Sequence, residues 1–164
     1  MRRMMKVAAV GAVGLAAGGT AWVLGMRDKD SIVVAAQRRL NKAVLNPNML
    51  KSAGTPGAYA SIVRHTGRTS GKVYATPVGA VPTDDGFVIA LVYGRRSDWA
   101  RNVLAAGSAE IVHEGREYGV ATPELIPLDE ATEWLPKSEL RPLRTFGVRD
   151  CLRVRTASES TAQT

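Results

Sequence analysis

Residues 58–93 read AYASIVRHTGRTSGKVYATPVGAVPTDDGFVIALVY and decide the fold class. Residues 58–64 and 72–81 are rich in β-branched and aromatic side chains, which predicts two strands. The nearly continuous apolar run 87–93 predicts a third strand, buried in the centre of a sheet. Turns rich in Gly, Ser, Thr and Asp are expected between these strands, at 65–71 and 82–86.

The sequence on either side adds helices and shorter strands. Ser97 or Asp98 can cap a helix that Gly107 ends, with Trp99, Val103 and Ala106 along one face. The other expected elements are an amphipathic helix over 31–45, strands over 109–113 and 116–122, a helix over 129–135 and a last strand over 152–154. Several antiparallel strands with few helices indicate an α+β domain built on a barrel of about six strands.

The N-terminal segment 7–26 carries no charge over 20 residues. A helix of this length spans the roughly 30 Å hydrocarbon layer of a membrane, so we interpret the segment as a membrane anchor. Arg2, Arg3 and Lys6 precede it as in a secretory signal. A cleaved signal and a helix packed on the protein itself are therefore the alternatives. More Lys and Arg follow the segment than precede it, which predicts a plasma-membrane protein whose domain faces the cytoplasm.

The formal charge of +7 is concentrated near the N-terminus. Residues 1–51 hold nine Lys and Arg against two Asp and Glu, whereas residues 52–164 hold thirteen of each kind. The excess cations lie beside the apolar segment, where they favour an anionic lipid surface over nucleic acid. Aromatic residues make up 5% of the chain, too few for a platform that stacks single-stranded bases.

The composition offers little for metal, disulfide or acid–base chemistry. The only cysteine, Cys151, cannot form an intrachain disulfide or a paired-cysteine metal site. The two histidines, His65 and His113, have no partner at a metal-ligand spacing, so no metal site is expected. We expect His65 in a turn, His113 at a strand end and Cys151 in the core. No catalytic side chain is expected, which is typical of an enzyme whose cofactor carries the chemistry.

Two glycine-bearing turns combine cations with backbone amides that can converge on an anion. The first, 65–72, reads HTGRTSGK, and its glycines permit the backbone of an anion-binding turn. The second, 93–99, reads YGRRSDW and leads into a helix start, whose unpaired N–H groups attract negative charge. Each turn alone is more typical of a solvated surface turn. Together they describe a site for a planar ring with an anionic tail.

The same turns resemble the two sequence blocks of a known family. Residues 66–71 (TGRTSG) and 76–78 (TPV) resemble the first block of the deazaflavin-dependent nitroreductase and quinone reductase family, and 94–104 (GRRSDWARNVL) resembles its second. The similarity covers residues 44–156. The resemblance implies a split β-barrel that binds coenzyme F-420, a deazaflavin with a phosphate and oligoglutamate tail. It also implies hydride transfer from the reduced ring to a quinone, a nitro compound or another electron-poor acceptor.

The resemblance further implies which side chains hold the coenzyme. These are Arg68, Ser70, Lys72, Arg95 and Arg96 for the tail, Thr76 and Pro77 at the ring edge, and Tyr93, Gly94 and Trp99 around the ring. Tyr74 stands where many members of the family carry Arg. Split barrels also serve FMN enzymes, so an FMN-dependent oxidoreductase stays open. A non-catalytic membrane-surface protein that binds the coenzyme or a lipid stays open as well.

The sequence thus divides into three parts. Residues 1–30 form the membrane anchor or signal segment, 31–156 the split-barrel deazaflavin-binding domain and 157–164 a disordered tail. The expected partners are a small-molecule acceptor such as a quinone and a membrane surface, with no nucleic acid. The resemblance also implies a homodimer.

Overall fold

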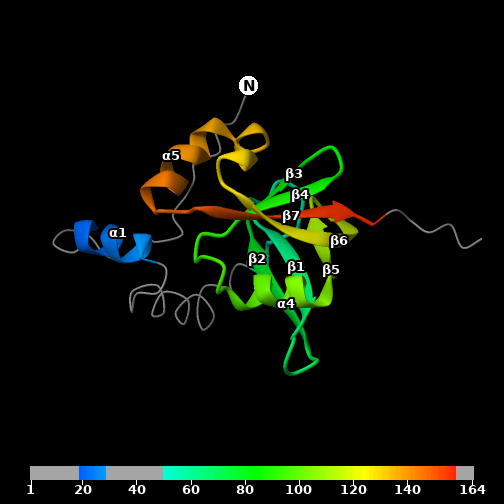
Figure 1. The fold of residues 1–164 in the computed structure, drawn as a ribbon. Helices are drawn as coiled ribbons and strands as arrows, with labels where there is room; N and C mark the ends of the chain where they lie inside the picture. The colour runs from blue at the N-terminus through cyan, green and yellow to red at the C-terminus, as the bar shows by residue number, and fades with distance from the viewer. Residues whose placement is uncertain (1–18, 29–49, 158–164) are drawn as a thin grey trace, which may run out of the picture.

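The computed structural model describes residues 19–28 and 50–157 (Figure 1). The expected helix over 31–45, the tail from 158 and residues 7–18 of the apolar segment lie outside the described residues. In chain order the elements are α1 Gly19–Arg27, β1 Ser61–Thr66, β2 Val73–Val78, β3 Ala80–Pro82, β4 Gly86–Ala90, α4 Asp98–Ala106, β5 Ser108–His113, β6 Arg116–Pro127, η2 Glu130–Glu133, α5 Lys137–Thr145 and β7 Asp150–Thr156.

All strand pairs are antiparallel, and the seven strands form one sheet in the order β2-β1-β5-β6-β7-β4-β3. The two edge strands, β2 and β3, follow one another in the chain and are separated only by Gly79. The chain therefore passes directly from one edge of the sheet to the other, which curls the sheet into a barrel. The expected strand over 72–81 is this pair, divided at Gly79, and the prediction of an α+β split β-barrel is confirmed.

The barrel interior is filled by side chains that alternate along the strands. In β1, Ser61, Val63 and His65 are buried while their neighbours are only half-buried or exposed, the period-two pattern of a strand with one face on the core. The largest buried side chains of this core include Val63, Ile89 and Leu152, and Ala100 and Val103 of α4 pack against them. Ala106, expected on the same face of α4, is exposed.

A second apolar cluster covers the outer face of the same sheet. Val88 and Cys151 belong to it, together with Ala131 of η2 and Leu143 of α5. Strand β4 lies between the two clusters, which explains why its sequence is apolar without alternation. Cys151 is fully buried as expected, and burial raises the pKa of its thiol to about 12.

Several element boundaries differ from the expectation. Strand β4 ends at Ala90 instead of residue 93, because the chain turns back on itself: the amide of Gly94 donates to the carbonyl of Leu91 at 2.8 Å. The expected helix over 129–135 is only the short 3-10 turn η2. Helix α5 was not expected, because its sequence is mostly polar and contains Pro142 in its interior. Strands β1, β6 and β7 each extend beyond their expected C-terminal ends.

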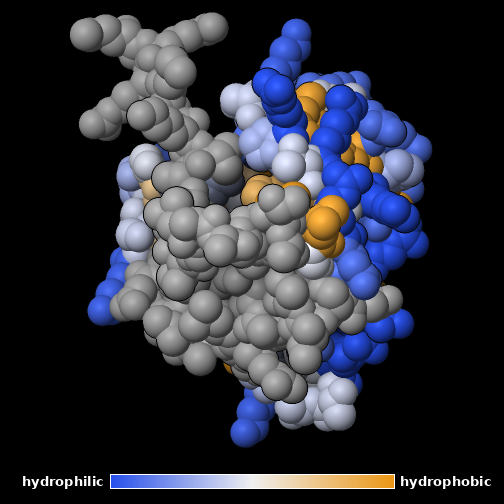
Figure 2. Space-filling view, turned by 90° about the vertical axis from the view of Figure 1, so that its left-hand side faces the viewer, coloured by the Kyte–Doolittle hydropathy of each residue, from blue (hydrophilic) through white to orange (hydrophobic). Residues whose placement is uncertain are grey.

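Helix α1 contacts the folded domain at its C-terminal end. Met26 is buried, the Arg27 guanidinium donates to the Thr145 carbonyl at 3.3 Å, and Arg27 lies against Gly147 after α5. Among the described residues, no helix has both the length and the apolar character needed to cross a membrane. Figure 2 shows this side of the molecule, where hydrophilic residues dominate the described part of the surface and hydrophobic residues emerge in a few places.

Candidate functional site

The start of α4 is built from a loop that leaves amide groups open. Gly94 has a φ of 77°, which glycine adopts without steric cost, and its carbonyl accepts from the amide and the hydroxyl of Ser97 at 3.2 and 2.9 Å. The Ser97 side chain is therefore turned back to the loop and makes no capping hydrogen bond to the helix. The first-turn amides of α4 keep their partial positive charge, so this end of the helix favours an anion.

The β1–β2 turn is closed by its own hydrogen bonds. The amide of Gly67 donates to the carbonyl of Lys72 at 2.8 Å, and that of Gly71 to the carbonyl of Gly67 at 2.8 Å. The Ser70 hydroxyl lies 3.0 Å from the Tyr74 hydroxyl. A methyl group on Gly67 would overlap Ser70 Oγ and lie 2.7 Å from the Tyr74 ring. A larger residue at position 67 would therefore require the exposed Ser70 and Tyr74 side chains to shift.

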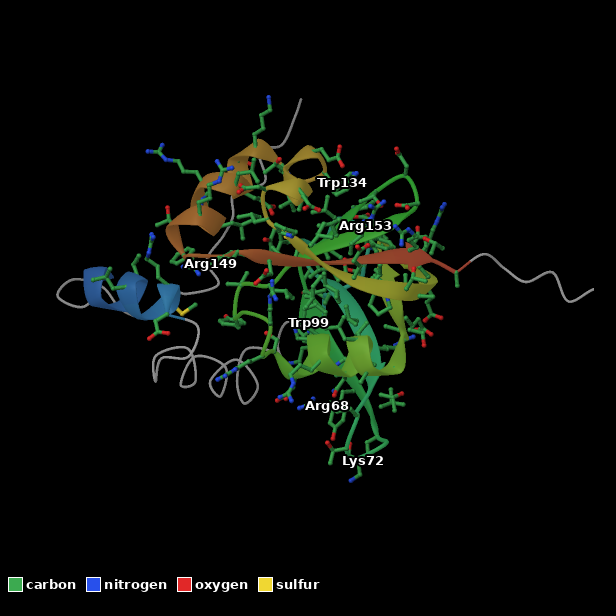
Figure 3. All side chains as sticks on the ribbon, in the orientation of Figure 1. Arg68, Lys72, Trp99, Trp134, Arg149 and Arg153 are labelled. Atoms are coloured by element: carbon green, nitrogen blue, oxygen red, sulfur yellow. The ribbon has the colours of Figure 1, made fainter. Side chains whose placement is uncertain are left out.

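Arg68 joins this turn to α4. Its guanidinium donates to Asn102 Oδ1 at 2.8 Å and forms an ion pair with Asp98 Oδ1 at 3.2 Å. Its backbone amide also donates to Asn102 Oδ1, at 3.1 Å. Asp98 and Asn102 are one helical turn apart, so both face the β1–β2 turn. The two blocks, separated by fifteen residues in sequence, therefore meet at the first turns of α4 (Figure 3).

His65 extends this connection into the interior. It lies on β1 with 5% of its surface exposed, so the expectation of a turn histidine was wrong. Its Nδ1 lies 3.1 Å from Asn102 Nδ2, and its Nε2 lies 3.1 Å from the hydroxyl of Thr76 on β2. Burial lowers the pKa of His65 below its ordinary value of 6.5, and the nearby Asp98 carboxylate opposes this shift.

Neither His65 nor Asn102 was expected at the site. Strand alternation could have found His65, because it shares the period of Ser61 and Val63. Asn102 lies in the second family block, 94–104, but no contact with the coenzyme was assigned to it. The other histidine, His113, ends β5 as expected, and its Nδ1 lies 2.8 Å from the Ser61 hydroxyl.

The structure brings some of the expected cofactor residues together. Thr76 is linked to Arg68 through the His65 network, and Pro77 follows Thr76 on the edge strand β2. Gly94 forms the loop before α4, and Trp99, in the first turn of α4, packs against the barrel core. Tyr93 lies beside Gly94 and is half-buried.

The remaining expected cofactor residues lie in the β1–β2 hairpin and in the loop before α4. Ser70 and Lys72 lie in the β1–β2 hairpin, and Figure 3 draws Lys72 at its outer end. Arg95 forms an ion pair with Asp150 of β7 at 2.6 Å, and this partner raises the pKa of Arg95. Arg96 is exposed beside it in the same loop. Arg95 therefore ties the loop before α4 to the start of β7.

The donor set of the site suits an anion and a polar ring edge. The described residues contain no group of three His, Cys, Asp or Glu side chains that could hold a metal ion. What they offer instead is an uncapped helix start, the guanidinium groups of Arg68 and Arg95 and the hydroxyl of Thr76. Groups of this kind hold phosphate or carboxylate and orient a ring by hydrogen bonds.

Several solved structures are similar to this chain. An F420-H2 dependent reductase (FDR-A) has 17% identical residues and a TM-score of 0.47, over 59% of this chain and 94% of its own. A structure described as a domain-swapped dimer has 15% identity and a TM-score of 0.49, over 74% and 98%. An F420 reductase has 11% identity and a TM-score of 0.43, over 66% and 92%. No curated protein matches the sequence.

A family model gives the decisive match. The model described as F420H(2)-dependent quinone reductase matches residues 33–143, which is more than half of the chain and includes both glycine-bearing turns. The chain therefore belongs to the family of F420H(2)-dependent quinone reductases, and it is an oxidoreductase whose cofactor is coenzyme F-420.

Proposed function

We propose that this chain binds the anionic tail of coenzyme F-420 at the start of α4 and reduces a lipid-soluble quinone at a membrane surface. The observation that carries the proposal is the bridge from Arg68 to Asp98 and Asn102, because it joins the two sequence blocks into one site. The uncapped amides of α4 and the neighbouring arginines supply the positive potential that a phosphate and carboxylate tail requires.

The residues of the site contribute binding and orientation. When bound, the reduced coenzyme supplies the hydride, and the quinone takes up this hydride and a proton to become a hydroquinone. Tyr93 lies in the loop before α4 and Trp99 in the first turn of α4, and their half-buried rings are the candidates to flank a planar group. Thr76 offers a hydroxyl at the ring edge, and its position is held by His65. Orientation of this kind brings donor and acceptor atoms to about 3–3.5 Å.

The membrane part of the proposal is supported by the N-terminal sequence. Residues 7–26 carry no charge, and the flanking cations suit an anionic lipid surface. A lipid-soluble quinone is held in such a layer, so an anchor would keep the enzyme beside its acceptor. That the domain faces the cytoplasm and that the protein forms a homodimer also stay predictions.

A spectroscopic assay tests the proposal. The purified full chain is mixed with reduced coenzyme F-420 and menadione, and the return of the oxidised coenzyme is followed by its absorbance and fluorescence. We expect turnover with the quinone and a colourless protein before addition. Tightly bound yellow flavin would indicate FMN instead, and tight F-420 binding without turnover across quinones and nitroaromatics would indicate a non-catalytic binder.

A further inference from the structure

The hydrogen bonds around His65 have a defined direction. The backbone amide and the guanidinium of Arg68 can only donate, and both point at Asn102 Oδ1, at 3.1 and 2.8 Å. This fixes the orientation of the Asn102 amide, so that its Nδ2 faces His65 Nδ1 at 3.1 Å. Because Nδ2 carries only hydrogens, His65 Nδ1 must be the acceptor of this bond.

The direction continues through the imidazole. A neutral ring that accepts at Nδ1 carries its hydrogen on Nε2, which then donates to Thr76 Oγ1 at 3.1 Å. A proton on Nδ1 would face the hydrogens of Asn102, so the charged ring does not fit. Two other groups act on His65: the Tyr74 ring of β2, stacked with centroids 5.8 Å apart, and the Asp98 carboxylate of α4. Burial and the donor at Nδ1 both favour the neutral ring.

Thr76 is the last residue in this series of hydrogen bonds. Its oxygen accepts from His65 at 3.1 Å, and a hydroxyl that accepts in this way keeps its own hydrogen for another acceptor. Successive hydrogen bonds in one direction polarise one another, so a series that begins at the Arg68 cation strengthens the last donor. We propose that His65 is a positioning residue that holds the Thr76 hydroxyl as a hydrogen-bond donor toward an acceptor atom at the edge of the coenzyme ring. This inference rests on the proposed function for the identity of the ligand.

The first test needs no ligand. The chain has two histidines, so the variant His113→Gln leaves the His65 imidazole alone in the spectrum. In protein without a histidine tag, long-range proton–nitrogen correlation of the ring at pH 7.5 should show a neutral imidazole with its hydrogen on Nε2. A hydrogen on Nδ1, or a charged ring at this pH, would overturn the direction of the series and with it the inference.

The second test measures the donor itself. Fluorescence titration of F-420 should give a dissociation constant about tenfold higher for Thr76→Val than for the unsubstituted protein, the usual size of one lost hydrogen bond to a polar group. Thr76→Ser keeps the hydroxyl and should stay within about twofold. In a His65→Leu background the valine substitution should cost less, because the hydroxyl is no longer oriented.

The outcomes separate this inference from the proposed function. If the unsubstituted full chain does not bind F-420 at all, the proposed function is overturned. Normal F-420 binding that is equal in Thr76→Val and Thr76→Ser would overturn only the role assigned to His65 and Thr76.

Discussion

Arg68 contacts α4 through two of its residues. Its guanidinium forms an ion pair with the Asp98 carboxylate and donates to the Asn102 amide oxygen. Its side chain keeps 27% of its surface exposed, so a ligand can still reach it. Arg68 therefore has two functions: it fixes the β1–β2 turn against α4 and neutralises a carboxylate that would otherwise repel an anion at the helix start.

His65 leads to a prediction on stability. The unfolded chain binds a proton at His65 as the pH falls through 6.5, and the folded chain does so only at a lower pH, because burial lowers the pKa of this group. The unfolded state therefore holds more protons in that interval. It follows that the free energy of unfolding decreases as the pH drops below 6.5, and that this group adds no pH dependence above it.

Urea denaturation of the unsubstituted chain and of His65→Gln at pH 7.5 and 5.5 measures this effect. The substitution should destabilise the protein less at pH 5.5 than at pH 7.5, because the penalty for protonating the buried ring is absent from the variant. An equal or larger loss at the lower pH would contradict a neutral, buried His65.

The elements show which parts of the fold can be predicted from local pattern. The strand over 72–81 was expected as one piece, and only the three-dimensional closure of the barrel divides it at Gly79. Strand β1 and the cap of α4 at Gly107, with φ of 73°, follow from alternation and from glycine at a helix end. Helix α5 had no such signal, because its stability comes from Leu143 packing on the outer cluster.

The substitution Gly86→Ala tests how closely strands β4 and β7 approach one another in the barrel. A methyl group there would overlap the Val154 carbonyl oxygen and lie 2.8 Å from Arg155 Cα, both in the backbone of the neighbouring strand β7. Gly86→Ala should therefore destabilise the protein by roughly 3 kcal/mol, the upper range for overpacking a site that cannot relax. Gly119→Ala in β6 is the control, because nothing lies within 4 Å of its added methyl group.

Thermal unfolding of the Gly86→Ala and Gly119→Ala variants, followed by circular dichroism, measures the difference in their stability. Gly119→Ala should change the stability by less than about 1 kcal/mol, since it only removes backbone freedom from the unfolded chain. Similar melting temperatures for the two variants would show that β4 and β7 do not approach as closely as the structure has them.

The whole molecule combines a charge-balanced domain with a basic, apolar N-terminus. Residues 52–164 hold equal numbers of acidic and basic side chains, so the entire excess charge lies within residues 1–51. The network of the site could not be predicted from sequence, because His65, Thr76 and Asn102 meet only when β1, β2 and α4 are packed together. The two turns that supply the site were recognisable, since glycine and arginine there follow the family pattern.

Charge placed within the apolar segment tests membrane association. Leu15→Lys should greatly reduce flotation of the full chain with vesicles of mixed anionic and zwitterionic lipid, because a lysine in the middle of a spanning helix costs about 2.5–3.5 kcal/mol. Gln163→Lys adds the same charge outside the segment and should float like the unsubstituted chain. Equal flotation of the two variants would contradict an inserted anchor.

The most direct test of the account is the affinity for coenzyme F-420 when the bridge between the two turns is cut. Arg68–Asp98 and Arg144–Asp129 are both ion pairs of 3.2 Å, so Arg144→Ala removes a comparable pair away from the site. In fluorescence titrations of the full chain, Arg68→Ala should raise the dissociation constant at least about tenfold, because it removes a cation and leaves Asp98 unpaired. Arg144→Ala should leave the constant within about twofold. An unchanged constant for Arg68→Ala would contradict a coenzyme site at the start of α4.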